Sequence, residues 1–314
     1  MTNMIANFFT NLFSIASFSI AEGLMWSLLA VGIFVTYRIL DVADLTTEGS
    51  FPLGGAITAA LIMSDLPPIV ATIGAVFGGM LAGLVSGIIH TKLKIPALLA
   101  GIITMTGLYS INSRVMGKKP NQALLGKQTI FNFMDEFNFT SNTVVIIIGL
   151  VTVLLVIGLL YTFFRTEIGL SIISTGDNIE MSQANGINTD FTKILGYMIA
   201  NGMIALSGSL IAQNNGYADI SSGIGTIVIG LAAIIISEVL FSKQPLLYRM
   251  FSVVLGAIIY RFILALILEL PIEANDNKFF SAVILVVALS FPLVQKKLQS
   301  NSKRQPKKRK GGVL

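Results

Sequence analysis

Charged side chains interrupt the apolar sequence close to its N-terminus. Arg38, Asp41, Asp44 and Glu48 lie between two strongly hydrophobic segments. Carboxylates in such surroundings are candidates for binding a coupling ion or for pairing with a charged solute, because an unpaired buried charge is costly. Alternatively, Arg38 pairs with Asp41 or Asp44 and only fixes the local backbone, since Asp41 lies within one helical turn of it. These residues leave both interpretations open.

Other kinds of chemistry have few candidates in this sequence. There is no cysteine and the single histidine is His90, which excludes disulfides, thiol catalysis and cysteine-ligated zinc and removes most imidazole-based sites. Residues 117–129 read GKKPNQALLGKQT and superficially resemble a phosphate-binding loop. In such a loop a serine or threonine follows the lysine, whereas Gln128 follows Gly126-Lys127 here. We therefore expect a chain that is not an enzyme and that holds no metal and no cofactor.

The longest polar insertion in the second half of the chain is residues 165–192, which read RTEIGLSIISTGDNIEMSQANGINTDFT. Asp177 or Asn178 can accept backbone N–H groups at the start of a helix. Glu180 then lies in the first turn, where the helix dipole favours a negative charge, and Gly186 can close the helix in the left-handed conformation. The pattern predicts a rigid two-turn helix. It is either a docking element for a partner or a solvated connector, and local capping does not distinguish the two.

Membrane-spanning helices must position these side chains. Hydrophobic residues make up 54% of the chain, charged residues 12%, and the mean hydropathy is +0.81, whereas a soluble domain carries about a quarter charged residues. The fold class is therefore all-α, a polytopic membrane protein with about nine transmembrane helices of roughly the ~20 residues that cross a bilayer. The predicted spans are residues 20–38, 51–63, 69–89, 96–116, 143–164, 194–213, 223–241, 251–268 and 279–294. Residues 1–19 form either a tenth span or an interfacial helix.

The connection between the first two predicted spans has the composition of a broken helix. The charged residues described above are followed by Gly49, Pro52, Gly54 and Gly55, so the break falls near residues 38–55. Such a break is tolerated only where protein or a water-filled cavity satisfies the freed backbone groups. Five predicted spans precede the polar loop and four follow it, which suggests two halves related by an inverted repeat.

The charge distribution predicts which side each loop faces. Eight lysines and arginines lie between residues 296 and 310, so the net charge of +5 becomes 5 − 8 = −3 for the rest of the chain. We expect a membrane domain over residues 1–296 and a basic cytoplasmic tail over 297–314 that contacts anionic lipid. The tail has no interleaved aromatic residues for base stacking, so nucleic acid is not an expected partner. Basic loops at 91–94 and 243–249 fall on the side of the tail, together with the polar loop.

The motif Gly176-Asp177-Asn178, then Glu180, then Gly186-Ile187-Asn188, resembles the cytoplasmic loop of the branched-chain amino acid and ribose permease family of ABC importers. Leu28–Gly32 and Asp44-Leu45-Thr46 are similar to a second characteristic region of that family. The resemblance covers most of residues 20–296 and is specific in the loop. The subgroup it resembles is associated with aromatic amino acids such as tryptophan. Met181-Ser182 departs from the two alanines that are frequent there, which blurs the subgroup.

The resemblance implies a transport subunit rather than an enzyme, in a bacterial plasma membrane with the C-terminus in the cytoplasm. Its partners would be cytoplasmic ABC ATPase subunits, which hold the ATP and Mg, an extracytoplasmic substrate-binding lipoprotein and a second copy of the chain. The family's coupling helix corresponds to the predicted loop helix. The residues that would contact the ATPase are Gly176, Asp177, Asn178, Glu180 and Gly186.

The expected substrate is a small solute, an aromatic or branched-chain amino acid, and the substrate path would lie where two copies meet. The candidates for its lining are Asp41, Asp44, Glu48, Phe51, Tyr109, Asn112 and Asn201. Two other functions stay open: a sugar or nucleoside permease of the same family, and an ion-coupled secondary transporter that uses Asp41, Asp44 and Glu48. An ATP requirement and an ATPase that co-purifies would distinguish an importer from a secondary transporter.

Overall fold

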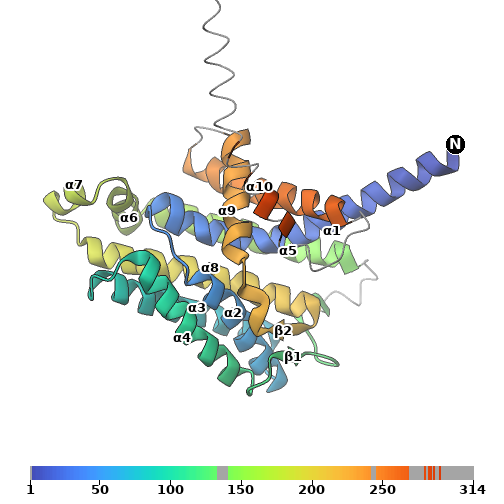
Figure 1. The fold of residues 1–314 in the computed structure, drawn as a ribbon, viewed down its shortest axis with the longest axis horizontal. Helices are drawn as coiled ribbons and strands as arrows, with labels where there is room; N and C mark the ends of the chain where they lie inside the picture. Colours follow the sequence, from blue (N-terminus) through green and yellow to red (C-terminus); the bar gives the residue numbers. More distant parts are fainter. Residues whose placement is uncertain are drawn as a thin grey trace, which may run out of the picture.

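The computed structural model describes residues 2–132, 141–241 and 245–268, with a few positions between 279 and 290. Within these ranges the chain is a bundle of long helices with one short two-stranded ribbon (Figure 1). Residues 269–278, most of the last predicted span and the basic tail lie outside the described residues. The inverted repeat stays a prediction.

Eight long helices account for the first eight predicted spans. Six of the helical segments in the described ranges are long and apolar enough to cross a membrane, so the chain is a polytopic helical membrane protein. Of the other two, α2 has only 17 residues and α4 carries polar side chains in its second half. The long helices are α1 (Thr2–Phe34), α2 (Thr47–Met63), α3 (Pro68–Thr91), α4 (Ala97–Val115), α5 (Ser141–Phe164), α8 (Thr189–Asn215), α9 (Thr226–Leu240) and α10 (Leu246–Leu268).

The N-terminal stretch does not form a separate tenth span. It continues without interruption into α1, whose candidate membrane-spanning part, Ser14–Ile39, extends through a π-helical turn, η1 (Val35–Ile39). The alternative of an extra span before the first one is therefore wrong. In Figure 1 the start of α1 extends away from the bundle.

The predicted break between the first two spans is confirmed, although it is shorter than expected. After η1 the chain is non-helical over residues 40–46, and Asp41 adopts a left-handed backbone conformation with φ of 54°. Helix α2 then begins at Thr47 and continues through Pro52. Proline lacks the N–H that would bond to the Glu48 carbonyl oxygen, and Gly223 packs closely against that oxygen.

The polar loop contains two helices where the sequence predicted one. Helix α7 (Ile179–Ala184) is the predicted short helix, and α6 (Glu167–Asp177) precedes it. Asn178 caps α7, because its side chain accepts a hydrogen bond from the Met181 N–H. Asp177 is instead the last residue of α6, so its assignment as an alternative cap was wrong. Thr166 caps α6 in the same way by accepting from the Gly169 N–H.

Helices α2, α3 and α8 form the packed centre of the bundle through small residues. A Cβ atom at Gly54 of α2 would overlap the Ala205 carbonyl oxygen of α8, and one at Gly208 of α8 would overlap the Phe51 carbonyl oxygen of α2. Gly83 of α3 packs in the same manner against α8. Close backbone approach at small residues is the usual packing device of membrane helices. The glycines of α3 that face α8 therefore mark a helix interface.

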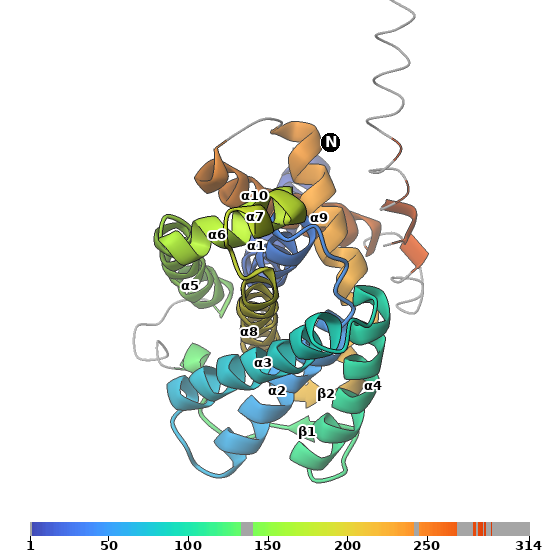
Figure 2. The same cartoon turned by 90° about the vertical axis from the view of Figure 1, so that its left-hand side faces the viewer.

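The bundle has two distinguishable ends, which lie apart along its horizontal long axis in Figure 1; the left-hand end of Figure 1 faces the viewer in Figure 2. We call one the loop end, because it carries α6 and α7; Lys92 forms an ion pair there with Asp190 at the start of α8. The predicted basic loop 91–94 and the polar loop 165–192 therefore meet. Arg249, from the second predicted basic loop, lies over the Phe34 ring near the end of α1. We call the other the hairpin end: there β1 (Asn121–Ala123) pairs antiparallel with β2 (Tyr217–Asp219).

Candidate functional site

Helix α7 presents an exposed surface at the loop end. Ile179 and Met181 are 41% and 63% exposed although both are apolar, and Asp177 and Glu180 beside them are also exposed. Gly186 ends the segment with φ of +80°, the left-handed conformation that its sequence position predicts. Exposed apolar side chains flanked by carboxylates on a short capped helix are suited to contact another protein.

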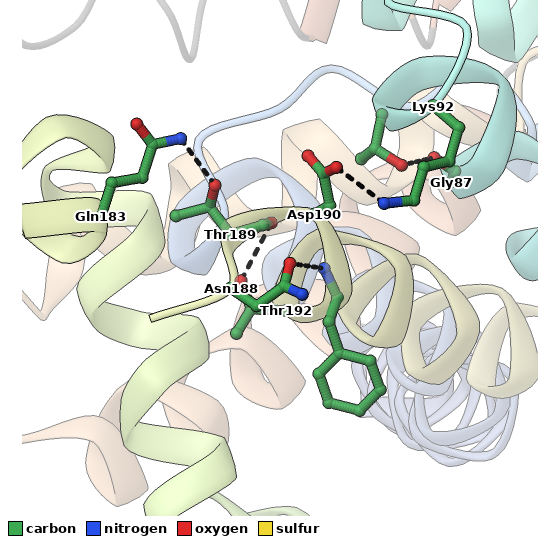
Figure 3. A network of polar contacts seen from close by, with 9 residues as sticks. Gly87, Lys92, Gln183, Asn188, Thr189, Asp190 and Thr192 are labelled. Atoms are coloured by element: carbon green, nitrogen blue, oxygen red, sulfur yellow. Dashed lines mark hydrogen bonds and ion pairs between the residues drawn. The ribbon is translucent and has the colours of Figure 1, made fainter. Parts of the chain in front are cut away.

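Hydrogen bonds tie α7 to the helices on both sides of it. Ser182 of α7 bonds to Ser174 of α6 at 2.8 Å, and the Gln183 amide donates to the Thr189 hydroxyl at the start of α8 at 3.0 Å (Figure 3). Thr175 of α6 and Thr192 of α8 are joined at 2.9 Å. Helices α6 and α7 are therefore attached to each other and to the start of α8.

The end of α6 is also packed against the break in the first helix pair. A Cβ atom at Gly176 would overlap the carbonyl oxygen of Ile39 and approach Leu40. The Leu40 side chain in turn lies against Gly196 of α8. Gly176 thus faces into the protein, and its contact connects α6 to the segment that leads into α2.

A buried carboxylate lies a few residues beyond this contact. Asp44 is 3% exposed, and both of its carboxylate oxygens accept hydrogen bonds, one from the Thr46 N–H at 2.9 Å and one from the Asn201 amide at 2.8 Å. Asn201 also donates to the Tyr197 carbonyl oxygen and accepts from the Ser50 hydroxyl at 2.7 Å. This network, which we call the Asp44 network, fixes the break and the start of α2 against α8.

The predicted pairing of Arg38 with Asp41 or Asp44 is wrong. Arg38 forms its ion pair with Glu238 near the end of α9, while Asp41 is exposed and Asp44 is bonded as described above. The reason is geometric: η1 and the left-handed Asp41 end the regular helix before Asp41, so the one-turn spacing that would align the pair does not hold there.

The remaining candidates for a substrate path lie mostly inside the bundle. The Glu48 carboxylate accepts from the Gly225 N–H at 3.0 Å, where Gly225 precedes α9, and Asn112 donates to the Gly49 carbonyl oxygen at 3.1 Å. Phe51 is 2% exposed and stacks on Trp26 at 5.1 Å between ring centroids. These contacts hold α2 in place.

Tyr109 differs from Glu48, Asn112 and Phe51 because it is 63% exposed on α4. In the same half of that helix Thr106, Ser110 and Arg114 are exposed at intervals of four residues, and Gly107 has no neighbour that a Cβ would meet. The exposed faces of α3 and α5 are instead dominated by large aliphatic and aromatic residues. Lipid tails favour the apolar faces of α3 and α5. The exposed polar side chains of α4 are therefore the better candidates for contact with solute or protein.

The sequence reasoning missed a cationic side chain within the bundle. Arg261 of α10 lies 4.0 Å from Glu22 of α1, with its guanidinium 4.0 Å from the centroid of the Trp26 ring. Trp26 also donates to Glu22 at 3.1 Å. Glu22 and Arg261 both fall inside predicted spans, and an ionisable residue within a span is the signal that would have identified them.

Within the described ranges, no group of three or more histidine, aspartate or glutamate side chains is placed to hold a metal ion. The single histidine, His90, bonds through Nδ1 with the Ile95 carbonyl oxygen at 2.9 Å. The described part of the chain thus offers polar contacts, an exposed short helix and closely packed long helices.

A family model and a curated relative each match almost the whole chain. A family model described as branched-chain amino acid transport system / permease component matches residues 15–289. A tyrosine transport system permease protein of Clostridioides difficile is 38% identical over 287 residues, which cover 91% of this chain and 94% of the relative. An autoinducer 2 import system permease protein, LsrC, of Yersinia pestis is 26% identical over 90% of this chain and 78% of its own length. A solved structure of PsaBC from Streptococcus pneumoniae in complex with Fab is similar with a TM-score of 0.49, at 16% identity and over 92% and 94% of the two chains.

Proposed function

Because the chain belongs to the branched-chain amino acid transport system permease family, we propose that it forms the translocation path of a binding-protein-dependent ABC importer for an amino acid. The exposed helix α7, tied by hydrogen bonds to α6 and α8, is the observation that carries this proposal. A transporter of this kind needs a surface that receives work from a separate ATPase, and α7 has the exposure and rigidity for it.

The proposed partner at α7 is a cytoplasmic ABC ATPase, which would hold the ATP and Mg. Asp177, Asn178 and Glu180 are exposed beside the apolar Ile179 and Met181. Gly186 sets the end of α7 by its left-handed backbone. This orientation places the loop end, with its basic segments, in the cytoplasm, in agreement with the preference of lysine and arginine for that side.

The contacts of Gly176 supply a route from the ATPase to the transmembrane helices. Displacement of α7 moves α6, because Ser174 and Ser182 are bonded. The end of α6 then bears on Ile39 and Leu40, which precede the Asp44 network. We propose that this contact transmits the closure of the ATPases to α2 and α8, since a shift between states needs contacts that differ between them.

The proposed path lies along α4, where two copies of the chain would face each other. Thr106, Tyr109, Ser110 and Arg114 give that surface hydroxyl and cationic groups that lipid does not favour. The buried Asp44 and Asn201 are then structural rather than part of the path, because they bond to each other. A homodimer would double every such surface about a two-fold axis.

An amino acid is the proposed substrate on the strength of the tyrosine transport relative. The more distant autoinducer 2 import relative keeps a sugar-like solute as the second candidate. An ion-coupled secondary transporter is disfavoured by the family and by the contacts of Asp44 and Glu48, which hold backbone and amide groups.

Charge reversal on α7 tests the proposal. The variant Asp177→Lys/Glu180→Lys should lose co-purification of the ATPase and ATP-dependent tyrosine uptake into membrane vesicles at least tenfold, while its abundance in the membrane stays normal. Asp65→Lys at the hairpin end is the control, since Asp65 is 81% exposed and pairs only with Lys127 among the described residues. Unchanged ATPase binding and uptake in the double variant would show that α7 is not the coupling surface. Uptake by the purified wild type on an ion gradient without ATP would instead identify a secondary transporter.

A further inference from the structure

A cavity of ≈ 220 Å³ lies at the hairpin end, between α2, the end of α8 and the segment from β2 through the 3₁₀ turn η3 (Ile220–Gly223). It is smaller than the ~300 Å³ lower bound of pockets for drug-sized molecules, so a small solute of metabolite size suits it. None of the residues proposed above for the ATPase contact or for the α4 path lines this cavity. Phe51, which the sequence suggested as a candidate for the substrate path, does line it.

The lining combines an apolar part with a polar part that lacks any basic residue. Phe51 and Ile211 belong to the apolar part, and Asn215, Asp219, Ser221 and Ser222 contribute an amide, a carboxylate and two hydroxyls. No lysine or arginine lines the cavity, so its only formal charge is negative. A cavity of this composition favours a solute that carries an ammonium group on an apolar body and disfavours an anion.

Asp219 is fixed in place and is still able to accept further hydrogen bonds. Its Oδ1 atom accepts from the Ser221 N–H at 2.6 Å, which orients the carboxylate. A carboxylate has about four acceptor sites, and in the described part of the chain no lysine or arginine forms an ion pair with Asp219. Asp219 is therefore a half-buried carboxylate without a lysine or arginine partner in those ranges.

The walls of the cavity are held by contacts on the far side of each element. Phe51 stacks on Trp26, which in turn lies against Arg261. The strand that carries Asp219 is paired with β1, with Asn121 opposite Asp219. A site with walls already in position loses less entropy when a ligand binds.

We propose that this cavity is a binding site for the amine-bearing solute on its way into the bundle, with the ammonium group on Asp219 and the apolar body against Phe51 and Ile211. The inference rests on the proposed function for the identity of the solute and deepens it, because it assigns a site and a recognition chemistry that the family match does not supply. Asn215 and Ser221 provide donors for a carboxylate on the same solute, whereas the Ser222 hydroxyl already donates to the Asp219 carbonyl oxygen at 2.7 Å.

The absence of cysteine from the sequence allows a direct test. Ser222→Cys is introduced into the full-length protein in membrane vesicles and labelled with a cationic and an anionic methanethiosulfonate reagent of similar size. We expect the cationic reagent to react roughly tenfold faster, because the thiol lies beside a carboxylate in a partly enclosed site. Adding Asp219→Asn should bring the two rates close together. Saturating tyrosine should slow the labelling several-fold, whereas 3-(4-hydroxyphenyl)propionate, which has no amine, should not.

Ser64→Cys is the matched control, since Ser64 is exposed and precedes another carboxylate, the exposed Asp65, outside this cavity. Its labelling should not respond to tyrosine. If tyrosine protects neither cysteine while ATP-dependent tyrosine uptake by the wild type is intact, the cavity is not a site for this solute and the proposed function stands. If tyrosine protects Ser222→Cys but the wild type shows no ATP-dependent uptake, the site stands and the proposed function fails.

Discussion

The substitution Asp44→Asn should destabilise the protein although it changes no exposed surface. Both carboxylate oxygens of Asp44 accept hydrogen bonds, from the Thr46 N–H at 2.9 Å and from the Asn201 amide at 2.8 Å. An asparagine side chain has one oxygen, so either orientation turns an NH₂ group toward one of these donors. Rotating the Asn201 amide does not restore the lost hydrogen bond. The Asn201 NH₂ group now donates to the Tyr197 carbonyl oxygen, and after rotation the amide oxygen would face that carbonyl oxygen instead.

The size of the effect follows from the burial of the site. Leaving one buried donor without an acceptor costs about 1–3 kcal/mol, and Asp44 is 3% exposed, so water does not replace the lost partner. For a chain of this length a loss of this size lowers the thermal midpoint by roughly 5 °C. We also expect the loss of stability to be local at first: α2 and α8 should separate before the other helices, because the Asp44 network joins them.

Asp41→Asn is the matched control. Asp41 is exposed and has a φ of 54°, and asparagine is one of the few residues that tolerates this left-handed conformation. Its midpoint should therefore stay within about 1 °C of the wild type, because surface changes of this kind cost no more than about 0.5 kcal/mol. Thermal unfolding of the two purified variants in detergent, followed by tryptophan fluorescence and by loss of soluble monomer, measures both shifts.

Equal midpoints for Asp44→Asn and the wild type would refute the Asp44 network as a structural element. A variant that keeps its stability and abundance but loses uptake would instead return Asp44 to the substrate path. Because the two outcomes differ in stability rather than in activity alone, the comparison separates a structural carboxylate from a transporting one.

Three further changes test the packing and the loop end. Gly176→Ala should uncouple ATP hydrolysis from uptake and lower the free energy of unfolding by about 1–3 kcal/mol, because the added methyl group overlaps the Ile39 carbonyl oxygen. Gly158→Ala on α5 is the control: a Cβ there meets nothing within 4 Å, so the change should be neutral or slightly stabilising. Gly54→Ala should lower the yield of folded protein in the membrane more than Gly176→Ala does, since its methyl group overlaps the backbone of α8 in the buried centre. Lys92→Gln removes the ion pair with Asp190, whose side chains are 57% and 44% exposed, and should lower the thermal midpoint by no more than about 2 °C, an effect that disappears in 1 M salt.

Several features of the fold depend on local sequence, and these were predictable. Long apolar runs of about 20 residues must be helices because a bilayer satisfies no free backbone groups, and the spans follow them closely. The cap at Asn178, the left-handed Gly186 and the break before α2 are also set within a few residues of chain. Even α6 had a local signal, since Thr166 caps its first turn and Glu167 follows.

The polar contacts that assign roles to side chains were decided only by the tertiary structure. Asn201 is 157 residues from Asp44, and Glu238 is 200 residues from Arg38. Sequence spacing favoured Arg38 with Asp41 because it assumes a continuous helix, and the π-helical turn removes that alignment. The cavity that Asp219 lines, likewise, exists only because α2, α8 and β2 converge. Which helix faces meet depends on packing of glycines and large side chains across the whole bundle, and no local pattern of residues carries that information.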